Sequence, residues 1–269
     1  MDILAAVLLA LGGLIAGFLA GVFGIGGGIV LVPVLLYYDY CRSAGMLSLV
    51  SMHVAMGTSL LVVMFASGAQ AWGYLRANQV IWRGVIFVAL AGVLGALLGS
   101  RIAAGLEGPS LRKIFGLILL VAAARLFSGR RKQGKESEPD LAPLPLLAIG
   151  LLVGFVSSLS GVEGALIAIP LMYTYLHFPL RKAFGTTSAA IVITAAAGAA
   201  GYMIWGWGNT TLPAGMPGFI DWQAAIPLIL GAVPGGIIGT RLAGRADTPA
   251  VRTIFAVVLL VVMLRMFFL

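Results

Sequence analysis

The stretch at residues 21–33 reads GVFGIGGGIVLVP, with five glycines in its first eight positions and a proline at its end. A second stretch, LSGVEGALIAIP at residues 159–170, looks like a degraded copy of the first to which one carboxylate, Glu163, has been added. Glycine readily adopts the positive φ angles that tight turns need, and it weakens helices. Both stretches therefore predict a break inside an otherwise helical, apolar segment.

The composition places the chain in a membrane. Hydrophobic residues make up 61% of its 269 residues and charged residues 10%, with a mean hydropathy of +1.07. Soluble domains contain about 45–50% apolar and about 25% charged residues. Apolar runs long enough to cross a hydrocarbon core of about 30 Å recur along the chain, which predicts an all-α polytopic membrane protein. These apolar segments span 3–38, 44–69, 80–104, 110–128, 144–177, 183–207, 222–243 and 250–269.

Charge and cysteine usage exclude several classes of function. The net charge is +8, but the basic residues lie mainly between apolar runs, and no basic face with interleaved aromatic residues suggests a nucleic-acid partner. Cys41 is the only cysteine, and with two histidines it offers no metal-ligand spacing, so we expect neither a metal nor a cofactor. The acidic start, MDILAAVLLALGG, predicts a retained segment rather than a cleaved signal peptide.

The chain is an internal duplication, with a first transmembrane repeat at 1–127, a polar linker at 128–143 and a second repeat at 144–269. An offset of 137 residues aligns the two glycine-rich breaks. An offset of 128 aligns AMGTS at 55–59 with AFGTT at 183–187, and an offset of 140 aligns the remaining helices of the two halves. Because the matches keep their order and the gaps fall in loops, shared hydrophobicity alone does not explain them.

The basic residues favour an inverted relation between the halves. If segments 3–38 and 144–177 each enter the membrane and return, every half is a broken helical hairpin plus three transmembrane helices. Twelve of the 17 basic residues, including those of the linker, then lie on the inner side, which is a normal positive-inside bias. Four crossings per half would make the halves parallel and divide the basic residues eight to nine. We therefore expect inverted repeats with a cytoplasmic linker.

The breaks are the first candidate site. A continuous helix over the 36 residues of 3–38 would be about 54 Å long, too long for one crossing, and a hairpin with its tip in the membrane fits better. Two helix starts facing one another would present backbone N–H groups and positive dipole ends to an anion. The alternative is that the glycines only let helices pack closely, which is our interpretation of the pairs Gly17/Gly21, Gly95/Gly99 and Gly235/Gly239. The predicted anion-binding residues of the breaks are Gly24, Gly26, Gly27, Gly28, Gly161, Glu163 and Gly164.

Polar residues inside the apolar segments extend this site. Glu163 lies deep in its segment, where an ionised carboxylate is costly, and we hypothesise that it couples transport to protons; its alternative role is a structural hydrogen bond between the tips. The motifs GTS and GTT place hydroxyl groups in the helix that follows each break. These hydroxyls could donate hydrogen bonds to a bound oxyanion; the alternative is that they bond backbone carbonyl groups of their own helix. Arg101 and Arg241 lie at helix ends, which favours a role as anchors at the lipid headgroups. Either residue could also guide anions towards the site. The predicted hydroxyl contacts are Thr58, Ser59, Thr186 and Thr187.

Enzyme motifs are incomplete in this sequence. No lysine follows the glycine cluster as a phosphate-binding loop requires, and Ile29 stands where a dinucleotide fingerprint needs glycine. An intramembrane serine protease would use Ser160 with His53 or His177, but Ser158 occupies the position that glycine takes in such proteases. We therefore expect no enzymatic activity.

The doubled G-x-x-G-x-G-G-G-x-x-x-x-P break, the two following GTS and GTT helices and the two-half layout resemble the sulfite exporter TauE/SafE family of membrane permeases. The second copy departs from the motif, with Glu163 where Gly26 stands and Ala165 where Gly28 stands. The resemblance implies a secondary transporter that moves sulfite or a small organosulfonate across a bacterial inner membrane. Open alternatives are a passive anion channel, an uptake permease for thiosulfate or sulfate, and a nontransporting assembly subunit. A homodimer is compatible with all of them.

Overall fold

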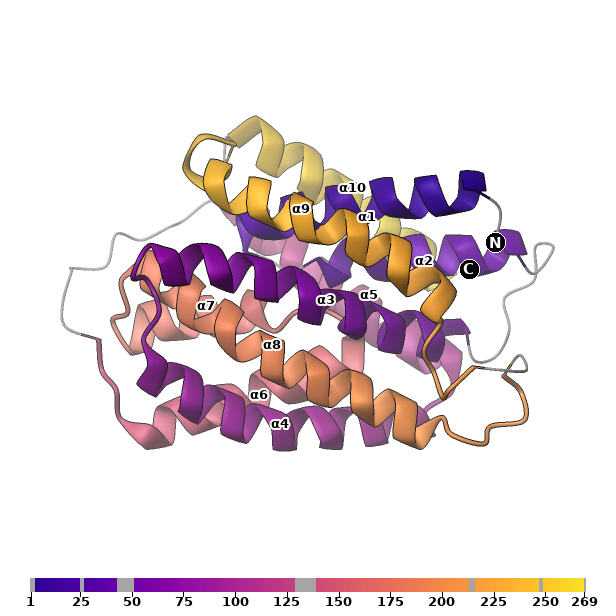
Figure 1. Ribbon diagram of the computed structural model, residues 1–269, viewed down its shortest axis with the longest axis horizontal. Coiled ribbons are helices and arrows are strands. Elements are labelled where there is room, and N and C mark those ends of the chain that lie inside the picture. Colours follow the sequence, from indigo (N-terminus) through magenta and orange to yellow (C-terminus); the bar gives the residue numbers. More distant parts are fainter. Residues whose placement is uncertain are drawn as a thin grey trace.

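A computed structural model describes residues 3–24, 27–42, 51–128, 139–212, 216–246 and 249–268 (Figure 1). Over these residues the chain forms helices and no strand. The helices are α1 (Ile3–Phe23), α2 (Gly28–Arg42), α3 (Ser51–Arg76), α4 (Trp82–Gly105), α5 (Gly108–Ser128), α6 (Pro143–Ser160), α7 (Ala165–Tyr175), α8 (Leu180–Trp205), α9 (Trp222–Ala246) and α10 (Pro249–Phe268). Most of the predicted linker falls outside the described residues.

Each predicted apolar segment contains helix, and the two longest segments contain two helices each. The breaks fall between α1 and α2 and between α6 and α7, where the glycine-rich stretches predict them. Helix α3 continues to Arg76, seven residues beyond the predicted end of its segment at 69. The added turns carry Gln70, Tyr74 and Arg76, whose polar groups lower the local hydropathy although the backbone stays helical.

Among the described residues, six helices are long and apolar enough to cross a membrane, namely α1, α3, α4, α6, α8 and residues Trp222–Ala243 of α9. This finding confirms a multi-pass, all-helical membrane protein. Helices α2 and α7 have 15 and 11 residues, which correspond to about 22 Å and about 16 Å at 1.5 Å per residue. Both are shorter than a hydrocarbon core.

The short helices fold back against the helices that precede them. A β-carbon placed on Gly12 of α1 would lie 3.2 Å from Val34 of α2, and one placed on Gly27 would lie 3.5 Å from the carbonyl oxygen of Ala16. In the second half, a β-carbon placed on Gly164, just before α7, would meet the side chain of Val153 on α6. Both pairs of helices are therefore hairpins, and their tips lie at Gly24–Gly27 and Gly161–Gly164.

Glycines bring the hairpins against the long helices of the opposite half. Helix α1 lies along α9, and helix α6 lies along α4 (Figure 1). Gly17 faces the backbone of Ala232, and Gly95 and Gly99 face the backbone of Leu151 and Phe155 so closely that a side chain would not fit. The interpretation of Gly17/Gly21, Gly95/Gly99 and Gly235/Gly239 as close-packing pairs is confirmed.

The two halves also meet along α3 and α8, which run antiparallel. Gly185 near the start of α8 packs against Tyr74 and Gln79 at the end of α3, and Gly57 near the start of α3 packs against Tyr202 at the end of α8. Helix α5 pairs with α10. The contacts of Gly57 and Gly185 are thus counterparts of each other in the two halves.

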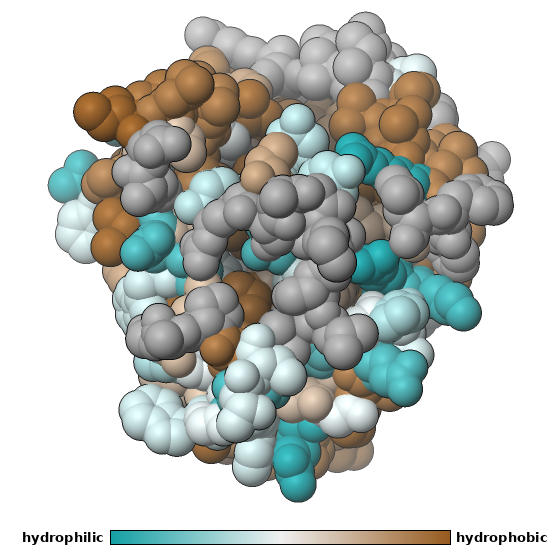
Figure 2. All heavy atoms as spheres, turned by 90° about the vertical axis from the view of Figure 1, so that its right-hand side faces the viewer, coloured by the Kyte–Doolittle hydropathy of each residue, from teal (hydrophilic) through white to brown (hydrophobic). Residues whose placement is uncertain are grey.

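Basic residues gather at the end of the molecule where α3 and α9 end and where α4 and α8 begin. This end, on the left of Figure 1, holds Arg76, Arg83, Arg181, Lys182 and Arg241. We call it the basic end. Figure 2 looks onto the opposite end, where hydrophilic side chains are scattered among less polar ones and hydrophobic side chains gather towards the upper flanks.

Candidate functional site

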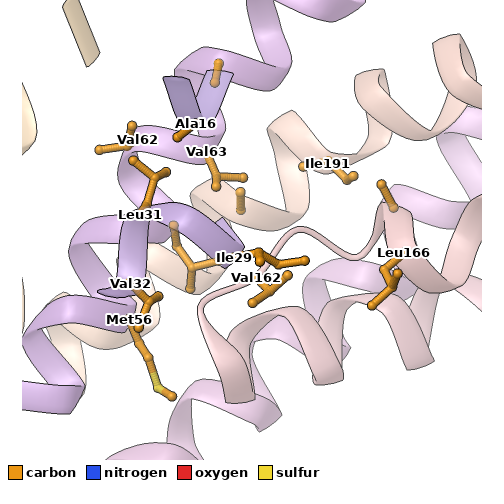
Figure 3. Close-up of a cluster of buried hydrophobic side chains, with 14 of the residues drawn as sticks. Ala16, Ile29, Leu31, Val32, Met56, Val62, Val63, Val162, Leu166 and Ile191 are labelled. Carbon is orange, nitrogen blue, oxygen red and sulfur yellow. The ribbon is translucent and has the colours of Figure 1, made fainter. Parts of the chain in front are cut away.

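The two hairpin tips touch in the interior of the protein. A β-carbon on Gly28 would lie 2.7 Å from the α-carbon of Val162 and would collide with the carbonyl oxygen of Gly161, so only glycine allows this approach. Ile29 lies beside Val162 within a buried apolar cluster (Figure 3). Gly27, Gly161 and Gly164 are buried as well, and Gly26 lies outside the described residues. The structure thus brings Gly27 and Gly28 of the first break against Gly161 and Glu163 of the second, whereas Gly24 faces Phe184 and Gly164 faces Val153.

The start of α2 is occupied by the carboxylate of Glu163. This side chain is 3% exposed, and its Oε1 accepts a hydrogen bond of 3.1 Å from the backbone N–H of Gly27. A helix start carries unpaired N–H groups and the positive end of the helix dipole, and a carboxylate satisfies both. The expectation of bare amides facing each other therefore needs correction at the first tip, because the chain supplies its own carboxyl oxygen as an acceptor there.

The second tip is held by hydroxyl groups. Ser59 of α3 donates a hydrogen bond of 2.8 Å to the carbonyl oxygen of Gly161, whose φ of +69° is the left-handed conformation that ends α6. The Ser160 hydroxyl donates to the carbonyl oxygen of Val156 at 2.7 Å. Gly24 has a φ of +62° at the corresponding place in the first half and packs against Phe184.

Thr58 and Thr186 make equivalent bonds between helices. The Thr58 hydroxyl accepts a hydrogen bond of 2.9 Å from the backbone N–H of Asp221, just before α9. The Thr186 hydroxyl accepts one of 3.0 Å from the N–H of Ile81, just before α4. Both threonines thereby fix the start of a long helix. Thr187 faces Met172, so Ser59 is the member of the GTS and GTT motifs with a hydrogen bond to a tip.

Four buried polar side chains near the tips lack a hydrogen-bond partner among the described residues. They are Ser67 and Gln70 of α3, through Oγ and Nε2, and Ser157 and Ser158 of α6, through their hydroxyls. Ser67 lies close enough to Glu163 to interact with it, although without good hydrogen-bond geometry. Buried polar groups are normally paired, so these positions are candidates for contact with a ligand. None of them is a predicted site residue; their only sequence signal is polarity at helical spacing.

A cavity of about 480 Å³ opens at the basic end beside the first tip. Arg181 and Arg241 lie on its wall, and both guanidinium-bearing side chains are exposed. The prediction for Arg241 is therefore compatible with anion guidance, whereas Arg101 lies over the ring of Trp205 at 4.6 Å, as a surface anchor does. The lining residues are Val22, Gly73, Tyr74, Ala77, Gln79, Leu180, Arg181, Phe184, Thr240, Arg241 and Ala243.

At the opposite end of the molecule, buried side chains fill the equivalent positions. Tyr202, the counterpart of Tyr74, is fully buried and donates a hydrogen bond of 2.8 Å to the carbonyl oxygen of Ser158. Phe219, the counterpart of Gln79, stacks on His53 with the ring centroids 5.0 Å apart. The same positions of the duplicated fold thus line a cavity at one end and hold buried, packed side chains at the other.

The protease alternative gains no geometric support. Ser160 bonds the carbonyl of its own helix, and His53 Nε2 bonds the carbonyl oxygen of Leu106 at 2.9 Å. Within the described ranges, no group of three His, Cys, Asp or Glu side chains could hold a metal ion.

Comparisons with known proteins identify a family for this chain. The family model of the sulfite exporter TauE/SafE matches residues 9–266. A probable membrane transporter protein of Xylella fastidiosa strain 9a5c is 30% identical over 87% of this chain and 83% of its own length. Probable membrane transporter proteins of Haemophilus influenzae and Bacillus subtilis (YunE) are 26% and 28% identical, each over 95% of both chains. No solved structure matches at a significant level.

The match covers both hairpins and all the long helices, and the relatives align over most of their length. The chain therefore belongs to the sulfite exporter TauE/SafE family and is a transmembrane transporter of that family.

Proposed function

We propose that this protein is a secondary transporter that exports sulfite or a small organosulfonate across a bacterial inner membrane. The observation that carries the proposal is the meeting of the two hairpin tips in the protein interior, where a helix start donates a hydrogen bond to a carboxyl oxygen. The site that receives the Glu163 carboxylate is chemically suited to another oxyanion. No phosphate-binding loop is present in the sequence, so an ion gradient or the gradient of the anion itself would drive transport.

The difference between the two ends supports alternating access over a passive channel. One end has an open cavity with two arginines, whereas Tyr202 and Phe219 are buried in the corresponding positions at the other end. A transporter built from two similar halves exchanges these arrangements when one half rocks against the other. A passive channel would need a path open at both ends at once.

The orientation that we propose is inverted repeats with the basic end in the cytoplasm. The antiparallel course of α3 and α8 supports it, as does the gathering of Arg76, Arg181 and Arg241 at one end. The linker at 128–143 joins α5 to α6 and would lie on the same side.

Glu163 is the proposed coupling residue. Its carboxylate holds the N–H of Gly27 in the buried contact between the tips. A proton on Glu163 would weaken this contact and free the helix start for the substrate, which would link anion binding to proton uptake.

Transport in proteoliposomes tests the proposal. Purified protein should take up labelled sulfite with saturation and should show counterflow when the vesicles contain unlabelled sulfite. Current without counterflow would favour a channel. The same assay with thiosulfate, sulfate and taurine identifies an uptake permease for another anion. Absence of transport, together with no anion-dependent change in thermal stability, would favour an assembly subunit and refute the proposal.

A further inference from the structure

We propose that Ser67 and Gln70 of α3 bind the transported oxyanion together with the backbone N–H of Gly27, and that the site belongs to the first half of the protein. This inference rests on the function proposed above and names the residues that would contact the substrate.

The two residues lie on a polar face of α3 that leads inwards from the cavity. Ser67, Gln70 and Tyr74 follow one another at intervals of three and four residues, which places them on one side of α3, and Ala77 lies just beyond the end of the helix. Tyr74 and Ala77 line the cavity, whereas Ser67 lies beside Glu163 at the tips. Gln70 lies between them on the helix, three residues after Ser67 and four before Tyr74. The face thus joins the opening at the basic end to the start of α2.

Both side chains have an unused hydrogen-bonding group. Ser67 is fully buried and Gln70 is 4% exposed, yet Ser67 Oγ and Gln70 Nε2 have no hydrogen-bond partner among the residues that the structure describes. Such groups lose their bonds to water on burial, and in their place Ser67 has only its poorly oriented approach to Glu163. A bound oxyanion would accept from both, since its oxygens are strong acceptors.

The second half lacks the same donors. With the offset of 128 residues, Ala195 and Gly198 of α8 correspond to Ser67 and Gln70. A β-carbon on Gly198 would meet Ser158 Oγ at 2.5 Å and the side chain of Leu60 at 3.0 Å, so the space that an amide would need is filled. The halves therefore differ here: α3 of the first half supplies Ser67 and Gln70, whereas the second half supplies Glu163 and, on α6, the hydroxyls of Ser157 and Ser158.

The donor chemistry defines the ligand class. A hydroxyl, a primary amide and a backbone N–H are neutral donors, and no lysine or arginine is buried among the described residues. Neutral donors suit a small oxyanion of low charge that must also be released, such as hydrogensulfite or a short organosulfonate. A multiply charged anion would need a buried cation to replace its hydration.

The test compares single variants in the full-length protein reconstituted in proteoliposomes. The variants are Ser67→Ala, Gln70→Met, which keeps the approximate length of the side chain, and Gln70→Glu, which adds a negative charge. Thr194→Val is the matched control, because Thr194 is a buried hydroxyl on α8 that bonds the carbonyl of Ile191 in its own helix. Initial rates of labelled sulfite uptake give KM and the maximal rate, and thermal unfolding without ligand reports folding.

We expect Ser67→Ala and Gln70→Met to raise the KM for sulfite about tenfold or more, as loss of a hydrogen bond to a charged group does. Gln70→Glu should abolish saturable uptake, whereas Thr194→Val should keep the KM of the unmodified protein. A KM within twofold of that value in both Ser67→Ala and Gln70→Met, with the unmodified protein active, would overturn this inference alone. If the unmodified protein neither transports nor binds sulfite or a sulfonate, the proposed function itself is wrong. If a variant has a lowered Tm, we measure how much sulfite raises the Tm of the fraction that is still folded. A rise equal to that of the unmodified protein contradicts the proposal, and the absence of a rise supports it.

Discussion

The contact between the two tips predicts a large effect of a single methyl group at Gly28. A β-carbon at this position would lie 2.7 Å from the Val162 α-carbon and even closer to the Gly161 carbonyl oxygen. Contacts between backbone atoms at such distances cannot relax through a side-chain rotation, so the tips would have to move apart. Overpacking of this kind costs about 1–3 kcal/mol. Since 1 kcal/mol corresponds to about 2–4 °C for a chain somewhat smaller than this one, Gly28→Ala should lower the Tm by about 2–12 °C.

Gly68→Ala is the matched control for this prediction. Gly68 also lies in a helix, but the nearest atom to its added methyl group would be a Val192 methyl at 3.9 Å, which is an ordinary contact. Alanine replaces glycine in a helix interior with a gain of about 0.5–1 kcal/mol, so this variant should be slightly more stable. Both are measured by thermal unfolding in one detergent at one scan rate. Equal Tm values for the two variants would refute the direct backbone contact of the tips.

Three further predictions concern transport in proteoliposomes. Glu163→Gln should remove the pH dependence of sulfite uptake and leave the protein folded, because glutamine keeps the shape of the side chain but cannot gain or lose a proton; an unchanged pH profile contradicts the coupling role. Arg241→Ala should slow uptake at least twofold at low ionic strength and less at high salt, because salt screens the attraction between an exposed charge and an anion. The control is Arg83→Ala, since Arg83 is exposed at the same end but does not line the cavity. Equal effects of the two substitutions would contradict guidance by the cavity. Tyr202→Ala should increase sulfite leakage without counterflow, because it removes the bond to Ser158 and the largest buried side chain of the closed end; unchanged leakage would show that Tyr202 does not form the barrier.

The hairpins could be predicted from sequence because their signals are local. A cluster of glycines inside an apolar run that is too long for one crossing leaves few alternatives to a turn within the membrane. The position of Glu163 within such a run also makes this residue a candidate on the sequence alone. Its partner, the N–H of Gly27, lies 136 residues away in the sequence and follows only from how the halves pack.

The hydroxyl motifs show where internal repetition is misleading. GTS and GTT recur, and their recurrence suggested ligand contacts, yet Thr58 and Thr186 each bond the backbone at the start of a long helix. In a duplicated fold, structural hydrogen bonds recur in both halves just as binding groups do, so recurrence alone does not identify a ligand contact. Ser67 and Gln70 present the opposite case, because the second half does not repeat them and only their burial and lack of a partner single them out.

The two ends differ in a way that bears on how substrate would drive the conformational change. His53 and Arg181 occupy equivalent positions, but His53 is buried against Phe219 whereas Arg181 is exposed at the cavity. If the halves exchange their arrangements, Arg181 would enter surroundings like those that His53 has now. Burial of an unpaired guanidinium group is costly, so the empty protein would resist closing the basic end. An anion paired with Arg181 would lower this cost, and closure would then follow substrate binding rather than precede it.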